Sequence, residues 1–217
     1  MAKDGTLNRL WLRTVRIASV VLAGLATAAL LGSAQHAMPM EREPQMRVLL
    51  HEGPKLLLRA DKEQWMQVRG LGAGVRRLRR LQLEQSGGSV VAVLDGRRRR
   101  LSSATVLTVQ NDDPRGIWLD SRRYRGEFQI SCRGGRLRVV NALGIETYLT
   151  SVVGSEMPHH WPLAALKAQA VAARTYALRQ RSRGGGWDVK ATVASQVYRG
   201  VEAETASTRR AVADTRS

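Results

Sequence analysis

Short apolar stretches separated by turn residues occupy the chain from Met46 to about Val140. Stretches of this kind, bounded by Gly, Asp or Asn, are typical of β-strands. The pattern predicts strands over residues 47–50, 55–58, 64–68, 89–94, 104–109, 124–130 and 136–140. Gly87-Gly88, Asp95-Gly96 and Gly134-Gly135 predict hairpin turns between them. We therefore expect an antiparallel β region.

The pattern changes after Asn141. Residues 145–153 form a mostly apolar, helix-compatible stretch, and Pro162 suits the first turn of a further helix. That helix is predicted over residues 163–181, which lack Gly and Pro and precede Gly184-Gly185-Gly186. Its small-residue face comprises Leu163, Leu166, Ala170, Ala173 and Ala177. A strand or loop is expected near residues 197–198 and a helix over 205–214, so the predicted fold class is α+β, with an N-terminal β-rich region and a helical core.

The N-terminus has the organisation of an export leader. Lys3, Arg9, Arg13 and Arg16 precede an apolar run that starts at Ile17 and ends near Gly32-Ser33-Ala34. A basic flank, an apolar centre and small residues predict a signal peptide cleaved after Ala34, and an uncleaved membrane anchor over residues 17–34 is the alternative. Either reading predicts that the rest of the chain is exported, in the periplasm or cell envelope.

The positive net charge of the chain limits the classes of binding partner that we expect. Lys and Arg number 35 against 18 Asp and Glu, a formal net charge of +17, and removal of residues 1–34 leaves +14. Outside the cytoplasm, this charge favours anionic envelope polymers as partners over nucleic acid, and the aromatic content of 5% argues against stacking platforms for single strands. Basic residues cluster at residues 76–80 and 97–100. The second run is interpreted as a solvated loop or strand edge, where charge opposes aggregation, and a specific polyanion site is the less favoured alternative for either run.

The single cysteine, Cys132, allows no intramolecular disulfide and no thiolate-rich metal site. We interpret it as a half-buried strand residue, because no activating base is identifiable near it.

Glu156 is the carboxylate that the sequence marks for chemistry. It is placed in a loop between two predicted helices, beside Met157, Pro158 and Trp161. Apolar surroundings disfavour a charged carboxyl, so its pKa is expected to be raised, as suits a general acid. A surface glutamate or a helix cap is the alternative interpretation.

The predicted helix 163–181 supplies basic partners. Lys167 and Arg174 are seven residues apart and project from nearly the same side, so together they could hold an anionic ligand. A solvated basic face is the alternative. Gln169 faces away from that side and is a weaker candidate, unless it supports the loop. His159-His160 lacks a third ligand, so no metal site is predicted.

Three ordered motifs together resemble a known family. They are the stretch from Asn141 to Leu149, the Val152-Val153-Gly154-Ser155-Glu156-Met157-Pro158 motif with the following Trp161 to Ala177, and Ser195-Gln196-Val197-Tyr198-Arg199-Gly200. This series is similar to the stage II sporulation protein D and amidase-enhancer (LytB) family.

The resemblance implies work on peptidoglycan. Family members include lytic transglycosylases that cut glycan strands, preferentially strands stripped of peptides, and enhancers of cell-wall amidases. The family's catalytic glutamate falls on Glu156 and its functional lysine and arginine fall on Lys167 and Arg174. Gln169, Gln196 and Tyr198 are further substrate-binding candidates. A single acid/base suffices for a lytic transglycosylase, because the sugar's own 6-hydroxyl is the nucleophile.

Two departures from the family pattern shape the expectations. Some members carry Cys and His zinc ligands where this chain has Thr192-Val193-Ala194-Ser195, so neither zinc nor another cofactor is expected. Members also continue beyond the position of Ser217, so the core is expected to be truncated here and its own activity to be in doubt. The expected organisation is a leader (1–34), a linker (35–45), a β-rich region (46–140) and a catalytic-type core (141–217).

Two functions follow from these features. The first is a lytic transglycosylase acting on denuded glycan strands. The alternative is a non-catalytic protein that binds the wall and stimulates an amidase.

Overall fold

The computed structural model describes residues 43–181 and 185–216. The predicted leader and most of the predicted linker lie outside these residues. Within the described ranges, no helix is both long and apolar enough to cross a bilayer. Residues from Glu43 onward form one compact unit.

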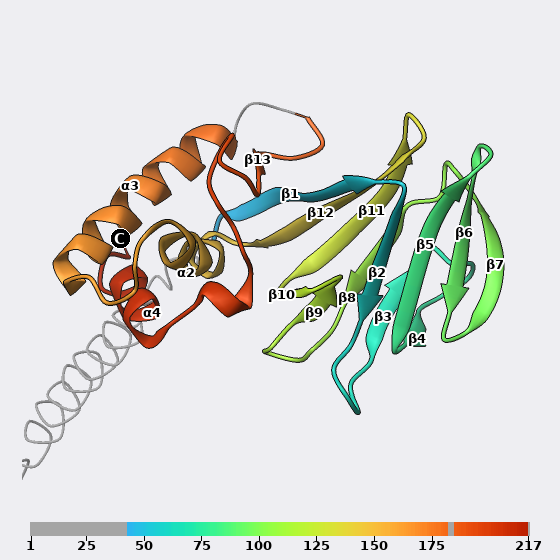
Figure 1. Ribbon diagram of the computed structural model, residues 1–217, viewed down its shortest axis with the longest axis horizontal. Coiled ribbons are helices and arrows are strands. Elements are labelled where there is room, and N and C mark those ends of the chain that lie inside the picture. The colour runs from blue at the N-terminus through green and yellow to red at the C-terminus, as the bar shows by residue number, and fades with distance from the viewer. Residues whose placement is uncertain (1–42, 182–184, 217) are drawn as a thin grey trace, which may run out of the picture. The chain divides into compact units, whose positions relative to one another are not determined.

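Two β-sheets carry most of this unit (Figure 1). The first has the order β13-β1-β12-β11-β8-β3-β4, and the second has the order β10-β9-β2-β5-β6-β7. The strands of the first sheet are β13 (Val189–Lys190), β1 (Gln45–Gly53), β12 (Arg136–Gly144), β11 (Glu127–Arg133), β8 (Leu107–Gln110), β3 (Met66–Arg69) and β4 (Arg76–Leu78). Those of the second are β10 (Arg122–Tyr124), β9 (Ile117–Leu119), β2 (Lys55–Arg59), β5 (Arg80–Ser86), β6 (Ser89–Leu94) and β7 (Arg97–Ser102).

Alternation of side chains builds the core between the sheets. In β5, Leu81 and Leu83 are buried, whereas Gln82 and Glu84 are not. Because successive side chains of a strand point to opposite faces, one face of each sheet can pack while the other meets water. The buried leucines of β5 join Phe128 and Ile130 of β11 in one apolar cluster.

The three predicted hairpin turns are confirmed. They join β5 to β6, β6 to β7 and β11 to β12, and each pair is antiparallel. Asp95 and Gly96 have φ of 46° and 88°, which a tight two-residue turn requires. The placement of Cys132 as a half-buried strand residue is also confirmed.

Several strands were not predicted, among them β5 (Arg80–Ser86), although its leucines alternate with polar residues. Strand β7 opens with four exposed arginines and takes its strand conformation from pairing with β6. The interpretation of residues 97–100 as a strand edge is right, because β7 is the last strand of its sheet. Strands β4, β9 and β10 have three residues each, too few for a visible alternation.

Three helices and a short 3₁₀ helix, η1 (Val201–Ala203), follow the main strands. Helix α2 (Ile145–Glu156) starts where β12 ends, so the predicted boundary at residues 140 and 141 falls inside β12. Helices α3 (Leu163–Arg181) and α4 (Ala206–Ala213) pack on α2 and on each other. The helices gather beside β1, β12 and β13, away from β4 and β7 (Figure 1). The α+β fold class is confirmed.

The predicted small-residue face of α3 packs inward. Leu166, Ala170, Ala173 and Ala177 are buried, and Leu163 is half-buried. Residues 197–198 form a loop.

Candidate functional site

Glu156 is the last residue of α2, which runs three residues farther than predicted. Its side chain is exposed, so the expected enclosure by apolar neighbours is wrong. Its Oε2 accepts a hydrogen bond of 2.7 Å from Nε2 of Gln169, and its Oε1 accepts one of 3.0 Å from the backbone N–H of Val197. The carboxylate is therefore exposed and yet held in one orientation.

A strip of backbone from residue 196 to residue 200 lies along α2 and supplies one of these bonds. Ser151 Oγ donates to the carbonyl of Gly200, and the N–H of Arg199 donates to Ser155 Oγ. With the Val197 bond, these contacts fix the strip to the half of α2 that ends in Glu156. We name residues 196–200 the site strip.

Two glycines permit close backbone contacts next to this strip, one between α2 and η1 and one between the strip and β10. A Cβ at Gly154 would overlap the carbonyl oxygen of Ala203. Gly200 has φ of 78°, which only glycine adopts freely, and a Cβ there would overlap the carbonyl oxygen of Arg123. Both glycines belong to the motifs that carry the family resemblance, so packing explains their presence there.

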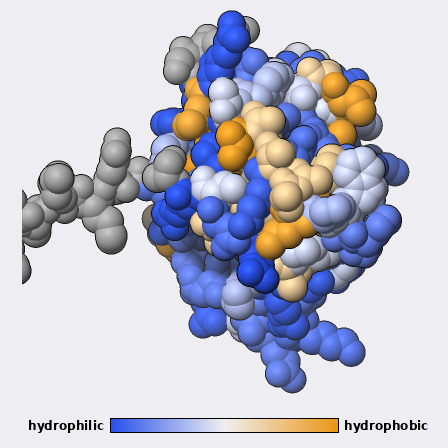
Figure 2. All heavy atoms as spheres, turned by 90° about the vertical axis from the view of Figure 1, so that its left-hand side faces the viewer, coloured by the Kyte–Doolittle hydropathy of each residue, from blue (hydrophilic) through white to orange (hydrophobic). Residues whose placement is uncertain are grey.

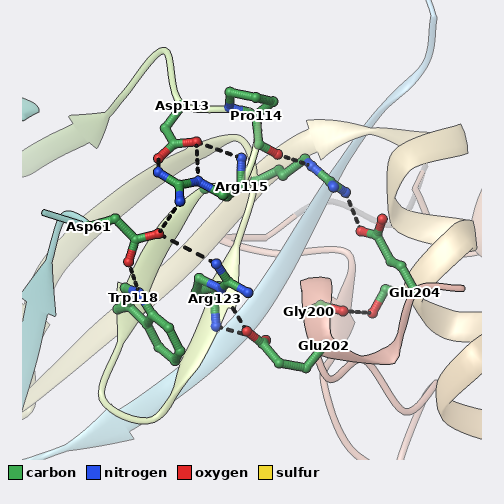
Figure 3. A network of polar contacts seen from close by, with 12 residues as sticks. Asp61, Asp113, Pro114, Arg115, Trp118, Arg123, Gly200, Glu202 and Glu204 are labelled. Carbon is green, nitrogen blue, oxygen red and sulfur yellow. Dashed lines mark hydrogen bonds and ion pairs between the residues drawn. The ribbon is translucent and has the colours of Figure 1, made fainter. Parts of the chain in front are cut away.

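A polar network anchors the end of the site strip to the second sheet (Figure 3). Arg123 of β10 donates through Nε and its backbone N–H to Glu202 of η1, at 2.8 and 3.0 Å. Arg123 also reaches Asp61, which accepts from the indole N–H of Trp118. Arg125 pairs with Glu204. Burial raises the pKa of Glu202, but the hydrogen bonds from Arg123 outweigh burial and lower it.

Gln196 and Tyr198 point into the protein. Gln196 accepts a 3.1 Å hydrogen bond from the Tyr148 hydroxyl and donates one of 3.3 Å to the carbonyl of Ala173. Tyr198 donates a 3.0 Å hydrogen bond to Asn141 Oδ1. Burial raises the pKa of both tyrosines, so their hydroxyls remain neutral donors. Gln196 and Tyr198 thus support the strip from beneath.

Lys167 and Arg174 lie on the flank of α3 that faces α4. Lys167 Nζ is 2.7 Å from Asp214. Arg174 forms a two-bond fork with Glu146, at 2.9 and 2.7 Å, and also donates to the carbonyls of Val212 and Thr215. Its side chain is only 11% exposed. In this arrangement Arg174 links α2, α3 and the end of α4.

The structure does not bring these two basic groups to Glu156. Gln169, which holds Glu156, lies about 200° around α3 from Lys167 and about 140° from Arg174, at about 100° per residue. On its own flank of α3, Gln169 holds the glutamate, whereas Lys167 and Arg174 hold Asp214 and Glu146. Sequence reasoning missed the N–H of Val197, and no side-chain pattern could have indicated a backbone donor.

Some large apolar side chains are exposed on α3 and just before it. Trp161 is 46% exposed, and Val171 and Leu178 of α3 are 50% and 39% exposed. Figure 2 shows the helix-bearing side of the molecule, with apolar groups scattered among hydrophilic ones. Among residues 43–181 and 185–216, no group of three or more His, Cys, Asp or Glu side chains could hold a metal ion.

Comparison with known proteins finds a family match for the second part of the chain. Residues 133–217 match the family described as "Stage II sporulation protein". An uncharacterized protein of Brachyspira hyodysenteriae is 40% identical over 104 residues, covering 46% of this chain and 28% of that protein. A Bacillus subtilis protein named "Amidase enhancer" is 40% identical over 86 residues, covering 39% of this chain and 12% of that protein.

The chain thus spans less than a third of the length of each of these relatives. No solved structure matches it. The matched segment contains α2, α3, α4 and the site strip. The match over residues 133–217 and the partial likeness to a protein named "Amidase enhancer" support the family resemblance that the motifs predicted.

Proposed function

We propose that this protein remodels peptidoglycan as a lytic transglycosylase, with Glu156 as its single acid and base. The observation that carries the proposal is the fixed and exposed carboxylate of Glu156 within the family segment. The relative named as an amidase enhancer supports the coarser part of the proposal, a role at the cell wall.

The proposed reaction uses one carboxyl group twice. Glu156 first gives its proton to the glycosidic oxygen, and the bond from that oxygen to the anomeric carbon breaks. Glu156 then takes the proton of the sugar's 6-hydroxyl as that oxygen bonds to the anomeric carbon. The product is an anhydro sugar, no water is consumed, and the glutamate returns to its starting state. Hydrolytic glycosidases commonly need a second carboxylate, and this route does not.

The hydrogen bonds to Glu156 suit this double use. A carboxyl group has about four positions on its two oxygens, and in the protonated form the acid proton takes one of them. Gln169 and Val197 each take one position on a different oxygen, so both oxygens keep room for the substrate. A reacting group held in one orientation needs less ordering when the substrate arrives.

We also propose that Lys167 and Arg174 contact the substrate. The two side chains differ in how readily each can leave its present partner. The Lys167 pair with Asp214 is about one third exposed on both sides, so water and salt screen it and it contributes little to stability. A substrate carboxylate could therefore replace Asp214. Arg174 is largely buried and holds several partners, so binding through it would require rearrangement of α4.

The test is the product formed from denuded glycan strands by the purified protein, read by mass spectrometry. The proposal predicts anhydro-muramyl ends, lighter by one water than hydrolysis products. Glu156→Gln should lower the rate at least about 100-fold, since general acid/base catalysis contributes about 10²–10⁴. Glu84→Gln, an exposed glutamate of β5, is the matched control and should leave the rate unchanged. Equal rates for Glu156→Gln and the parent would refute the assignment.

A second candidate function rests on the relative named as an amidase enhancer. In this alternative the protein binds the wall without cutting it and stimulates an amidase. Unchanged glycan strands together with faster amidase turnover would favour this function over catalysis. Export to the periplasm or cell envelope, through the predicted leader, is part of both proposals.

A further inference from the structure

Eight exposed arginines gather along one side of the β-sandwich. They are Arg76, Arg77, Arg79, Arg80, Arg97, Arg98, Arg99 and Arg100. We name them the arginine face. They come from β4, from Arg79 and the first residue of β5, and from β7. Strands β4 and β7 are the outermost strands of the two sheets, on the side away from α2, α3 and α4 (Figure 1).

Specific contacts join the two arginine runs into one surface. Asp95, in the turn before β7, accepts hydrogen bonds from the backbone N–H groups of Arg79 and Arg80, at 3.0 and 2.7 Å. Arg99 of β7 donates through Nη1 to the carbonyl of Leu71, ahead of β4, at 2.7 Å. The fold therefore brings together two basic runs that are separate in the sequence.

Among the described residues, no ion pair neutralises the guanidinium groups of this face, and Asp95 bonds only backbone N–H groups there. Across the described ranges, no carboxylate lies within 4.0 Å of the guanidinium groups of these eight arginines, whereas Arg47, Arg115 and Arg123 each have an acidic partner. Arg99 and Arg100 bond neutral oxygens, and Arg77 and Arg79 lie over the ring of Trp65. The side chains of Arg76, Arg80, Arg97 and Arg98 have no partner among the described residues.

The spacing of these groups suits a linear ligand. Alternate residues of a strand lie about 6.6–6.8 Å apart on one face. Arg98 and Arg100 form one such row on β7, and Arg97 and Arg99 form the other. A guanidinium fork matches the oxygens of a phosphate group in two hydrogen bonds. Regularly spaced phosphates along an extended chain could therefore meet several arginines at once.

The same face is poorly suited to two other partners. A membrane-binding surface usually inserts Trp, Phe or Leu, and the exposed large apolar residues flanking these strands are Val75 and Val106. Single-stranded nucleic acid is held by free aromatic rings, and the ring of Trp65 is already covered by Arg77 and Arg79.

We propose that the arginine face is a binding site for a linear, phosphate-bearing polyanion. The site is separate from Glu156 and would hold the protein on an anionic envelope polymer. The expected location at the cell envelope rests on the proposed function. Binding of the polyanion does not depend on glycan cleavage. Arginines placed only to block edge-to-edge pairing of β4 and β7 would show no such preference.

The test measures binding of the full chain to long-chain inorganic polyphosphate at several salt concentrations. The variant replaces Arg76, Arg80, Arg97 and Arg98 by Gln, because this change breaks no described side-chain contact. The matched control replaces the exposed Arg133, Arg179, Arg181 and Arg216 by Gln, which removes the same charge elsewhere. We expect the variant to bind at least about 10-fold more weakly and its log–log salt slope to fall by roughly 2–3, at about 0.7 per lost contact.

The control should bind within about 3-fold of the parent. Equal losses in variant and control would overturn the proposal, because general charge would then suffice. Tighter binding to phosphatidylglycerol vesicles or to single-stranded DNA than to polyphosphate would also overturn it, as would equal affinity for tripolyphosphate. Glu156→Gln should bind polyphosphate as the parent does, so failure of the catalytic proposal and failure of this one give different results.

Discussion

The candidate acid and base, Glu156, depends on two donors for its orientation. One is Gln169, thirteen residues later on α3, and the other is a backbone N–H of the site strip. The motif alone pointed to the glutamate, and helical periodicity placed Gln169 on the flank opposite Lys167 and Arg174. That Gln169 meets the carboxylate follows only from the packing of α3 on α2.

Replacement of Gln169 by Leu tests this positioning role. The change removes one hydrogen bond to Glu156 at an exposed position, so the free energy of unfolding should fall by no more than about 1 kcal/mol. In the glycan-cleavage assay we expect kcat to fall about 10-fold with little change in KM, because orientation and not substrate affinity is lost. Gln180→Leu, at a later turn of α3, is the control. Parent-like kcat in Gln169→Leu would contradict the role.

The partner of Arg174 could not be predicted from the sequence. Its spacing from Lys167 predicted a shared anion site, but Glu146 already occupies its guanidinium fork. Glu146 lies on another helix, and no local pattern in α3 indicates it. The seven-residue spacing of basic side chains on a helix is the same whether they are exposed or buried in ion pairs.

At the scale of elements, a close backbone contact between α2 and η1 lies next to the candidate site. Gly154 is the residue of α2 that permits it, because the carbonyl of Ala203 lies where a Cβ would be. The apolar pattern predicted α2, α3 and the hairpins well. It missed strands such as β7, whose conformation comes from its neighbour and not from its own residues.

Gly154→Ala tests the close contact. Alanine favours a helix by up to about 1 kcal/mol over glycine, so a free helix position would be stabilised. Here the overlap with Ala203 must be relieved by backbone movement, and we expect a net loss of about 1–3 kcal/mol in urea denaturation. Gly186→Ala, where a Cβ meets open space, should change stability by less than about 0.5 kcal/mol. A stabilised Gly154→Ala protein would show that the contact is not formed.

At the scale of the whole molecule, ion pairs connect the sandwich to the helices. The network in Figure 3 ties Asp61, Arg123 and Glu202 together across this connection, with Asp113 and Arg115 beside it. Hydrogen bonds from the Arg115 side chain lower the pKa of Asp113, whose side chain is only 3% exposed. A lowered pKa makes the folded protein more stable above the ordinary value of about 3.8.

The network therefore predicts acid sensitivity with a defined sign. The contribution of Asp113 is present above pH 4 and is lost as the pH falls through its lowered pKa, because the unfolded chain then binds the proton more readily. Asp113→Asn should cost about 1–3 kcal/mol at pH 7 and should make the decline in unfolding free energy between pH 5 and pH 3 shallower. The exposed neighbour Asp112 provides the control, and Asp112→Asn should keep the slope of the parent. A parent-like slope for Asp113→Asn would contradict this account.

The charge of the chain divides between distinct tasks in the folded molecule. Part of it pairs with acids that join the sandwich to the helices, and the eight arginines of the arginine face remain unpaired by acids within the described residues. The arginine runs were visible in the sequence. Their union into one surface depends on the two sheet edges lying together, which local patterns do not specify.

The most direct test of the central claim compares the parent and Glu156→Gln on denuded glycan strands, with products identified by mass spectrometry. We expect anhydro-muramyl ends from the parent and at least about a 100-fold slower appearance of these ends with the variant. Equal rates from both proteins, or products that carry an added water, would contradict it.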